Sequence, residues 1–154
     1  MNVRLYQAED SAVLARLFTE TVQTINAADY SPQQVETWAG RPLELERWCR
    51  LLPGRVVFVA EHDSEIVGFA TFEPNGHLDR LYVHHRFQRH GIASALVRRI
   101  EEEAVSRGID RIFTEASITA RPFFEHIGFR LIAPQTVAVA GTSFLNYRME
   151  KFLG

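Results

Sequence analysis

The residues from Leu81 to Leu96 constrain the fold of this chain more than any other stretch. The apolar run 81–83 predicts the end of a buried strand, a polar and basic turn follows it, and Gly91 begins a helix. This helix is expected to reach about Arg107. One of its faces carries an apolar stripe, which consists of Ile92, Leu96, Val97 and Ile100.

The start of this helix is suited to binding an anion. The backbone N–H groups of the first helical turn have no partner within the helix, and the positive end of the helix dipole lies there. Such a helix start attracts phosphate groups above all. Because Gly91 has no Cβ, a phosphate can lie directly against the backbone. The residues expected at the anion are Gln88, Arg89, His90, Gly91, Ile92, Ala93 and Ser94.

The remaining segments predict an α/β (mixed α+β) fold. Apolar runs indicate strands at residues 2–6, 55–61, 66–72, 77–83, 111–116, 129–139 and 144–151. Helices are expected after Asp10 or Ser11, after the capping box that begins at Ser31, around residues 45–52 and at residues 120–126. Antiparallel hairpins come first and a strand–helix–strand crossover comes later. This order indicates a mixed sheet flanked by helices.

Length and composition are consistent with one soluble domain. The chain has 154 residues and a net charge of −2, so no basic excess points to nucleic acid or to an anionic membrane. No apolar run approaches the roughly 18 residues of a membrane-spanning helix. The one cysteine, Cys49, excludes an internal disulfide and fits a reducing, cytoplasmic compartment. The absence of the glycine-rich lysine motif disfavours a P-loop nucleotide enzyme.

The histidines do not predict a metal site. The chain has six of them, and they show no ligand spacing such as His-x-x-x-His. The adjacent pair His84 and His85 would point to opposite faces if both lay on a strand. No metal is therefore expected.

A strand followed by Gln88-x-x-Gly91-x-Ala93 and an amphipathic helix resembles the acyl-CoA site of the GNAT superfamily of N-acetyltransferases. The resemblance covers about residues 2–151 and implies that residues 1–154 form one GNAT domain. Its sheet would be mixed but mostly antiparallel, splayed between the fourth and fifth strands, and flanked by helices. The co-substrate would be acetyl-CoA, with its pantetheine arm in the gap. The backbone of Leu81, Tyr82 and Val83 would pair with the pantetheine amides as an added strand does.

The resemblance also suggests where a general base would lie. Side chains alternate along the strand at 77–83, so His77 and Asp79 share one face. In histone-acetylating members a glutamate occupies the position that matches His77, and arylalkylamine-acetylating members carry histidines there and two residues later. His77 and Asp79 are therefore the predicted catalytic residues. Glu115 and Glu73 remain as alternative bases.

The usual acid of the family is missing from this chain. The family pattern after the fifth strand is Asn-x-x-Ala-x-x-φ-Tyr, in which φ is apolar and the tyrosine donates to the leaving thiolate. Here Ala120 matches, but Ser117 replaces the asparagine and Phe124 replaces the tyrosine. Because phenylalanine has no proton to donate, acid catalysis at that position is excluded. Ser117 and Phe124 are still expected to contact the pantetheine. The phenols that remain as candidates are Tyr30, Tyr82 and Tyr147.

The acceptor pocket is expected between the first helices and the last strands. Tyr30, Trp38 and Glu115 are predicted to bind the acceptor substrate, and the pocket is expected to be partly aromatic. The stretch from Asn26 to Trp38, together with residues 117–124, is similar to a bacterial subgroup of uncharacterised acetyltransferases. This similarity narrows the subgroup and leaves the acceptor open.

Taken with these residues, the resemblance implies an acetyl-CoA-dependent N-acetyltransferase acting on a primary amine of a small molecule or peptide. Direct attack in a ternary complex is expected, because no cysteine lies near the thioester motif. The alternative is a non-catalytic acyl-CoA-binding sensor or scaffold, which the loss of the tyrosine favours and the retained His77 and Asp79 disfavour. Dimers are common in similar proteins, so a homodimer stays open.

Overall fold

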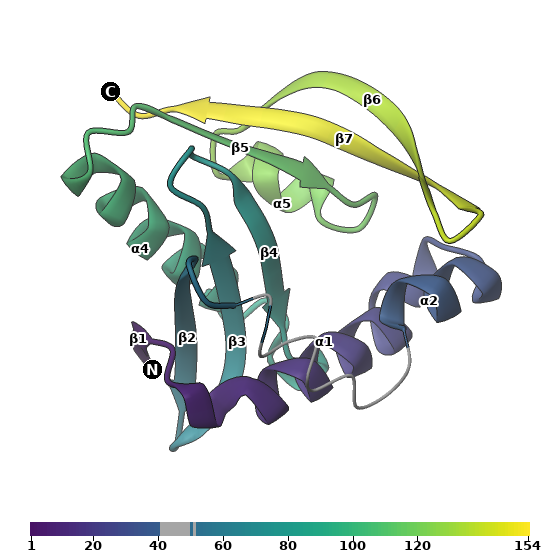
Figure 1. Ribbon diagram of the computed structural model, residues 1–154, viewed down its shortest axis with the longest axis horizontal. Coiled ribbons are helices and arrows are strands. Elements are labelled where there is room, and N and C mark those ends of the chain that lie inside the picture. The colour runs from purple at the N-terminus through teal and green to yellow at the C-terminus, as the bar shows by residue number, and fades with distance from the viewer. Residues whose placement is uncertain (41–49, 51) are drawn as a thin grey trace.

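The computed structural model describes residues 1–40, 50 and 52–154 (Figure 1). The strands are β1 (Asn2–Leu5), β2 (Val56–His62), β3 (Glu65–Phe72), β4 (Leu78–Val83), β5 (Arg111–Ala116), β6 (Arg130–Val139) and β7 (Thr142–Phe152). The α-helices are α1 (Ser11–Thr24), α2 (Pro32–Ala39), α4 (Ile92–Ser106) and α5 (Arg121–His126). Short 3-10 turns are η1 (Ala8–Asp10), η2 (Asn26–Ala28) and η3 (His85–Phe87). The helix expected around residues 45–52, with Trp48 and Cys49, falls mostly outside the described residues.

The strands form two antiparallel sheets that meet at one point. The first has the order β1-β2-β3-β4 and the second has the order β5-β7-β6. Among the residues that the structure describes, one isolated parallel bridge, between His77 and Phe113, joins them just before β4. Beyond this bridge β4 and β5 diverge (Figure 1). The predicted mixed, mostly antiparallel sheet that splays between its fourth and fifth strands is confirmed.

Helix α4 covers one face of the first sheet and carries the main core. Its stripe of Ile92, Leu96, Val97 and Ile100 is buried as predicted, together with Ala104. The helix approaches the sheet closely at Gly68 in β3. A Cβ at that position would lie 3.0 Å from Cγ2 of Ile92 and 3.2 Å from the carbonyl oxygen of Tyr82. Gly68 therefore sets the distance between β3, β4 and the start of α4.

Helix α1 packs on the opposite face of the same sheet. Leu14 and Leu17 form a second apolar cluster with Phe69 of β3. Asp10 stands at the start of α1 but does not cap it as expected. Its carboxylate accepts instead from Arg4 at 2.9 Å and from the backbone N–H of Gln7 at 2.8 Å. None of the helices in the described part of the chain is long and apolar enough to span a membrane.

The capping box at Ser31 starts α2 as predicted. Oγ of Ser31 accepts from the backbone N–H of Gln34 at 3.1 Å, and Oε1 of Gln34 accepts from the backbone N–H of Ser31 at 2.8 Å. Helix α2 then contacts the tip of the β6–β7 hairpin. There Nε2 of Gln34 donates to the carbonyl of Ser143 at 2.8 Å, and Thr37 bonds Thr142 at 3.1 Å. The hairpin thus connects the second sheet to the helices of the first.

Candidate active site

The turn before α4 has the backbone shape of an anion cradle. Gly91 takes the N-cap position in the left-handed region, with φ of 77°, and Arg89 also has a positive φ of 63°. No side chain caps the helix at Gly91. A Cβ placed on Gly91 would meet no protein atom within 4 Å, so this position faces open space. The N–H groups of the first turn are consequently accessible to a ligand.

Gln88 braces this turn against the end of β4. Its Nε2 donates to the carbonyl of Val83 at 2.6 Å, and Oγ1 of Thr21 donates to the same carbonyl at 3.3 Å. The first residue of the predicted motif thus has a structural role that the sequence pattern does not reveal. It fixes the turn relative to the strand, which pre-organises the cradle.

The free edge of β4 faces β5. The backbone N–H of His84 donates to Val67 of β3 at 2.7 Å, so alternate residues back along β4 also direct their backbone groups to β3. Leu81 therefore directs both its N–H and its carbonyl to the gap, as pairing with a pantetheine requires, whereas Val83 offers only its N–H, because its carbonyl already accepts from Gln88 and Thr21. The backbone of Tyr82 belongs to the ladder with β3, which corrects the expectation for this residue. The side chain of Tyr82 still lines the gap.

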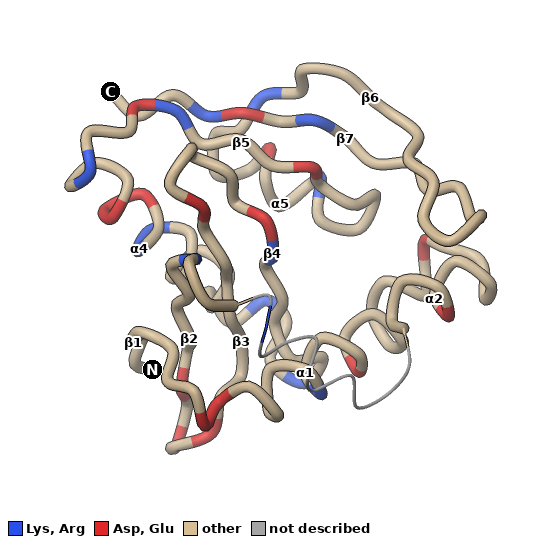
Figure 2. The backbone as a smooth tube through the Cα atoms, in the orientation of Figure 1, with Lys and Arg blue, Asp and Glu red and all other residues tan. Residues whose placement is uncertain are grey.

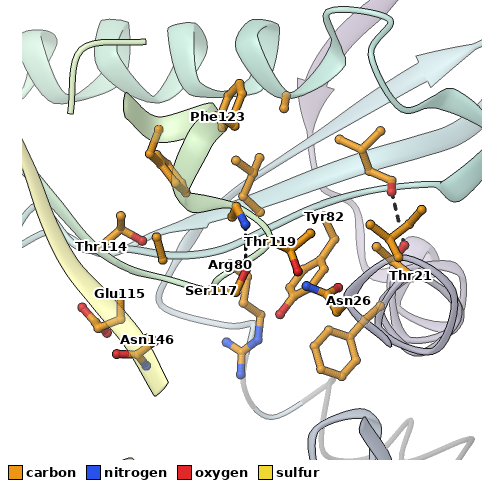
Figure 3. A pocket seen from close by; sticks show the side chains of 18 of the residues that line it. Thr21, Asn26, Arg80, Tyr82, Thr114, Glu115, Ser117, Thr119, Phe123 and Asn146 are labelled. Carbon is orange, nitrogen blue, oxygen red and sulfur yellow. Dashed lines mark hydrogen bonds between the residues drawn. The ribbon is translucent and has the colours of Figure 1, made fainter. Parts of the chain in front are cut away.

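A cavity of about 910 Å³ lies between the two sheets and brings the predicted site residues together. It extends from the start of α4 past β4 and β5 to α1, α2 and β7 (Figure 3). The predicted residues in its wall are Tyr30, Trp38, Asp79, Leu81, Tyr82, Val83, Gln88, Arg89, Gly91, Ile92, Ala93, Ser94, Glu115, Ser117 and Phe124. His77 and His90 do not line it, and neither do the alternative base Glu73 and the candidate phenol Tyr147. His90 is exposed in the turn before Gly91.

His77 is held between two carboxylates beside the bridge between the sheets. Its Nδ1 lies 2.7 Å from Oε1 of Glu73, and its Nε2 lies 2.9 Å from Oε1 of Glu115. The imidazole also stacks on Phe113, with ring centroids 4.9 Å apart and planes 11° apart. Burial lowers the pKa of His77, but the hydrogen bonds to Glu115 and Glu73 outweigh this effect and raise the pKa to about 9. His77 is therefore an imidazolium at neutral pH, which disfavours it as the base.

Acidic residues gather where the two sheets begin to part (Figure 2). Asp79 is a bulge residue, because the ladder pairs Leu78 and Arg80 with successive residues of β3. Its Oδ2 accepts from Nη1 of Arg80 at 2.7 Å and lies 3.7 Å from Nη2 of Arg55. The carboxylate of Asp79 is thus committed to arginines. That of Glu115 is exposed at its end of the cavity, with only Oε1 bonded among the described residues.

The phenols differ in what their hydroxyl groups do. The hydroxyl of Tyr30 donates to the carbonyl of Leu145 at 3.0 Å and accepts from the backbone N–H of Ile118 at 2.9 Å, so it is fully used. The hydroxyl of Tyr82 accepts from Nε1 of Trp38 at 3.2 Å, and its own proton has no acceptor in the described chain. Burial raises the pKa of Tyr82 to about 12. Tyr82 is therefore the phenol of the cavity wall that keeps a free donor.

Ser117 and Phe124 shape the wall near α5. Oγ of Ser117 accepts from the backbone N–H of Ala120 at 3.0 Å, so it stabilises the turn before α5. Phe124 is buried and packs edge-on against Phe123 and Phe129. Phe124 thus forms an apolar wall where the family carries a proton donor.

Asn146 is a cavity residue that the sequence analysis missed. It lies on β7 at the same end of the cavity as Glu115 (Figure 3), and its Oδ1 is buried without a hydrogen-bond partner in the described residues. Two-residue alternation along the strand at 144–151 could have found it, because Asn146 shares a strand face with Phe144, which also lines the cavity. Arg80 and Thr114 were also missed, and both line the cavity.

His84 and His85 do not point to opposite faces as expected. Both follow the end of β4, and their rings stack with centroids 4.3 Å apart near Glu20 of α1. Nδ1 of His84 accepts from the backbone N–H of Arg86 at 3.1 Å, so the proton of the neutral ring is on Nε2, 3.8 Å from Oε2 of Glu20. A metal ligand needs the opposite arrangement, with a lone pair on the outward nitrogen.

Fold and cavity together define the class: an acyltransferase-type α/β domain whose sheet parts over a cavity, with an uncapped helix start at one end and carboxylates at the other. The chain belongs to the GNAT acetyltransferase family, and the model of its acetyltransferase (GNAT) domain matches residues 26–151. It is accordingly an N-acetyltransferase by family, as predicted.

Relatives agree with this assignment over nearly the whole chain. The uncharacterized N-acetyltransferase YafP of Escherichia coli (strain K12) is 34% identical over 97% of this chain and 95% of its own. A crystal structure of a GCN5-related N-acetyltransferase from Rhodopseudomonas palustris superposes with a TM-score of 0.94 at 31% identity, over 99% of this chain and 95% of that one. A structure of PaiA N-acetyltransferase from Thermoplasma acidophilum, in complex with coenzyme A, shares the fold with a TM-score of 0.78 at 19% identity, over 99% of both chains.

Proposed function

We propose that this chain transfers the acetyl group of acetyl-CoA to a primary amine of a small molecule or peptide, by direct attack in a ternary complex. One observation carries the proposal. The anion cradle before α4 and the carboxylate of Glu115 open onto the same cavity, which passes between β4 and β5. A nucleotide thioester and an amine can therefore enter from different ends and meet at the gap.

Acetyl-CoA would lie along the gap with its pyrophosphate at Gly91. The N–H groups at the start of α4 would bind the phosphates, and Leu81 and Val83 would pair with the pantetheine amides. The coenzyme A held by a fold relative, PaiA N-acetyltransferase, supports this choice of co-substrate. Phe124 would pack against the pantetheine from the side of α5.

The acceptor end offers groups that match an amine. The carboxylate of Glu115 and the unpartnered Oδ1 of Asn146 both accept hydrogen bonds from N–H donors. Tyr30, Trp38 and Phe144 pack edge-on or tilted against one another and form an apolar wall beside them. A primary amine with an apolar body suits this combination.

The transfer needs a proton acceptor for the amine, a donor to the carbonyl oxygen and a donor to the leaving thiolate. The amine gives up a proton to a carboxylate of the cavity wall, for which Glu115 and Asp79 are the candidates. A backbone N–H on the free edge of β4 donates to the carbonyl oxygen as it gains charge. The free proton of Tyr82 stabilises the leaving thiolate through a hydrogen bond. Since a phenol with a pKa near 12 holds its proton firmly, it donates a bond rather than a whole proton.

Direct attack and a reducing compartment fit the cysteine content. The lone cysteine, Cys49, is distant in sequence from the thioester motif, so an acetyl-cysteine intermediate is not proposed. We place the enzyme in the cytoplasm for the same reason.

The test is a pair of measurements on the purified protein. Isothermal titration should show acetyl-CoA binding, and a thiol-release assay over a panel of primary amines should show turnover above acetyl-CoA hydrolysis. Binding without thiol release for any amine would favour the sensor or scaffold, which the replacement of the family tyrosine by Phe124 also suggests. Absence of binding would refute both functions.

A further inference from the structure

The side chains of Glu73, His77 and Glu115 form a charged group that connects the two sheets. The steps proposed for the acetyl transfer give no role to the positive charge of His77 in this group. His77 immediately precedes β4, Glu73 precedes the turn before it, and Glu115 lies on β5. The carbonyl of His77 accepts from the backbone N–H of Glu73 at 2.8 Å, and Gly76 accepts from the backbone N–H of Phe113 at 3.1 Å. The imidazole is thus fixed by backbone, by stacking and by both ring nitrogens.

Both carboxylates and arginines surround the His77 imidazole, and together they favour its protonated form. Three carboxylates face it, those of Glu73, Glu115 and the neighbouring Asp79. Arg55 approaches from the strand-β2 side, with Nη2 4.0 Å from Glu73 and 3.7 Å from Asp79. The guanidinium carbon of Arg111 lies over the ring of Phe113, 5.0 Å from its centroid. Two short hydrogen bonds to carboxylates need two N–H donors on the ring, and only the imidazolium has two.

A ring in this state has no lone pair for an ammonium proton. Glu115 differs, because its Oε2 has no partner in the described part of the chain and its side chain is 37% exposed at the cavity wall. Asp79, the other carboxylate of the wall, is bonded to Arg80. The three groups therefore have different roles. Glu73 accepts a hydrogen bond from His77 and fixes its ring, His77 donates to Glu115 and orients its carboxylate, and Glu115 faces the acceptor.

We propose that Glu115 is the catalytic base of the acetyl transfer and that His77 is a positioning residue, an imidazolium at neutral pH that fixes the Glu115 carboxylate toward the acceptor amine. This inference rests on the proposed function. It assigns to His77 a role opposite to the one predicted from the sequence, since the residue supplies charge and orientation and does not take up a proton.

The proton balance of the step is complete with these groups. Oε2 of Glu115 takes one proton from the acceptor ammonium and later releases it to water. The freed lone pair forms the C–N bond to the thioester carbon, and the C–S bond breaks as the sulfur takes the electron pair. A second proton leaves the nitrogen and ends on the sulfur of coenzyme A. The net products are the N-acetyl amine, coenzyme A and one proton.

Substitution by arginine separates the two roles of His77. His77→Arg keeps a permanent cation with several donors and cannot act as a base at any accessible pH. We expect it to retain kcat within about tenfold of wild type, whereas His77→Gln, which is uncharged, should lose roughly 100-fold. Acetyl-CoA affinity should be unchanged in both. Glu115→Gln should lose at least as much kcat as His77→Gln. His126→Gln is the matched control, because His126 is exposed and lies outside the cavity. This variant should leave kcat and acetyl-CoA affinity unchanged.

Equal loss in the arginine and glutamine variants, with both still folded by circular dichroism, would overturn the inference. Full activity of Glu115→Gln would do the same.

Nitrogen NMR of histidine-labelled protein gives a test that needs no substrate. The His77 signal, identified by its absence in His77→Gln, should stay that of a doubly protonated ring through pH 8 and titrate near pH 9. In Glu115→Gln it should titrate at lower pH, because one of the two carboxylates is gone. Titration of wild-type His77 near 6.5 would refute the inference whatever the enzyme does. A high titration point in a protein that turns over no amine would refute the proposed function instead.

Discussion

Gly91 offers the sharpest test of the anion cradle, because the structure separates its effect on the fold from its effect on binding. A Cβ there meets no protein atom within 4 Å, so no clash is expected in the free protein. The positive φ of 77° costs a non-glycine residue about 1 kcal/mol. For a chain of this size that corresponds to a fall in Tm of about 2–4 °C. Every further effect should appear only when acetyl-CoA binds.

The charge of an introduced carboxylate sets the size of the binding effect. At a separation of about 5 Å and an effective dielectric constant of about 20, one unit of like charge costs about 3 kcal/mol. This corresponds to roughly 100-fold weaker binding from a single phosphate charge alone. Gly91→Asp should therefore weaken acetyl-CoA binding by at least about 100-fold, and added salt should recover part of the loss.

Two control variants isolate the cause. Gly91→Asn has nearly the size of the aspartate variant without its charge, so the difference between the two in titration calorimetry measures the electrostatic part. Gly108, at the other end of α4, has a φ of 73° and also faces open space. Gly108→Asn should therefore lower Tm by a similar amount and leave acetyl-CoA affinity unchanged. An affinity of Gly91→Asp within about threefold of wild type, with the protein folded, would refute the placement of the pyrophosphate.

Three further outcomes follow from single contacts. Tyr82→Phe removes the free phenol donor and should lower kcat roughly 10- to 100-fold with little change in acetyl-CoA affinity. Tyr30→Phe instead breaks two structural hydrogen bonds and should mainly lower Tm, so steady-state kinetics and thermal melts distinguish the two variants. Equal kcat values for Tyr82→Phe and wild type would exclude Tyr82 as the donor. Gly68→Ala should cost about 1–3 kcal/mol in urea unfolding, because its Cβ would press on Ile92 and the Tyr82 carbonyl, and an unchanged midpoint would show that α4 moves freely. The hydrogen bonds from Arg4 outweigh burial and lower the pKa of Asp10. The ionised Asp10 carboxylate therefore stabilises the folded protein above pH 4, and this stabilisation is lost as the pH falls through the lowered pKa. Asp10→Asn should have a lower Tm than wild type at pH 7, and the two Tm values should converge toward pH 2.

Sequence alone determined the parts of this protein that depend on local order. The capping box at Ser31, the Gly91 turn and the stripe on α4 are short-range patterns, because each is set by backbone dihedral angles or by helical periodicity. The succession of hairpins and one crossover then limited the sheet to a mixed type that parts beside the crossover helix. The glycine motif on this framework was enough to identify the family.

Tertiary structure decided the chemistry of individual groups. Whether His77 is a base or a fixed cation depends on Glu115, which is 38 residues away and reaches it only because β4 and β5 meet at one bridge. Asn146 enters the cavity through the register of β7, and Gln88 turns inward to Val83. Proton affinity and hydrogen-bond commitment are set by neighbours within a few ångströms, and such neighbours come mostly from distant segments, so no local pattern of residues encodes them.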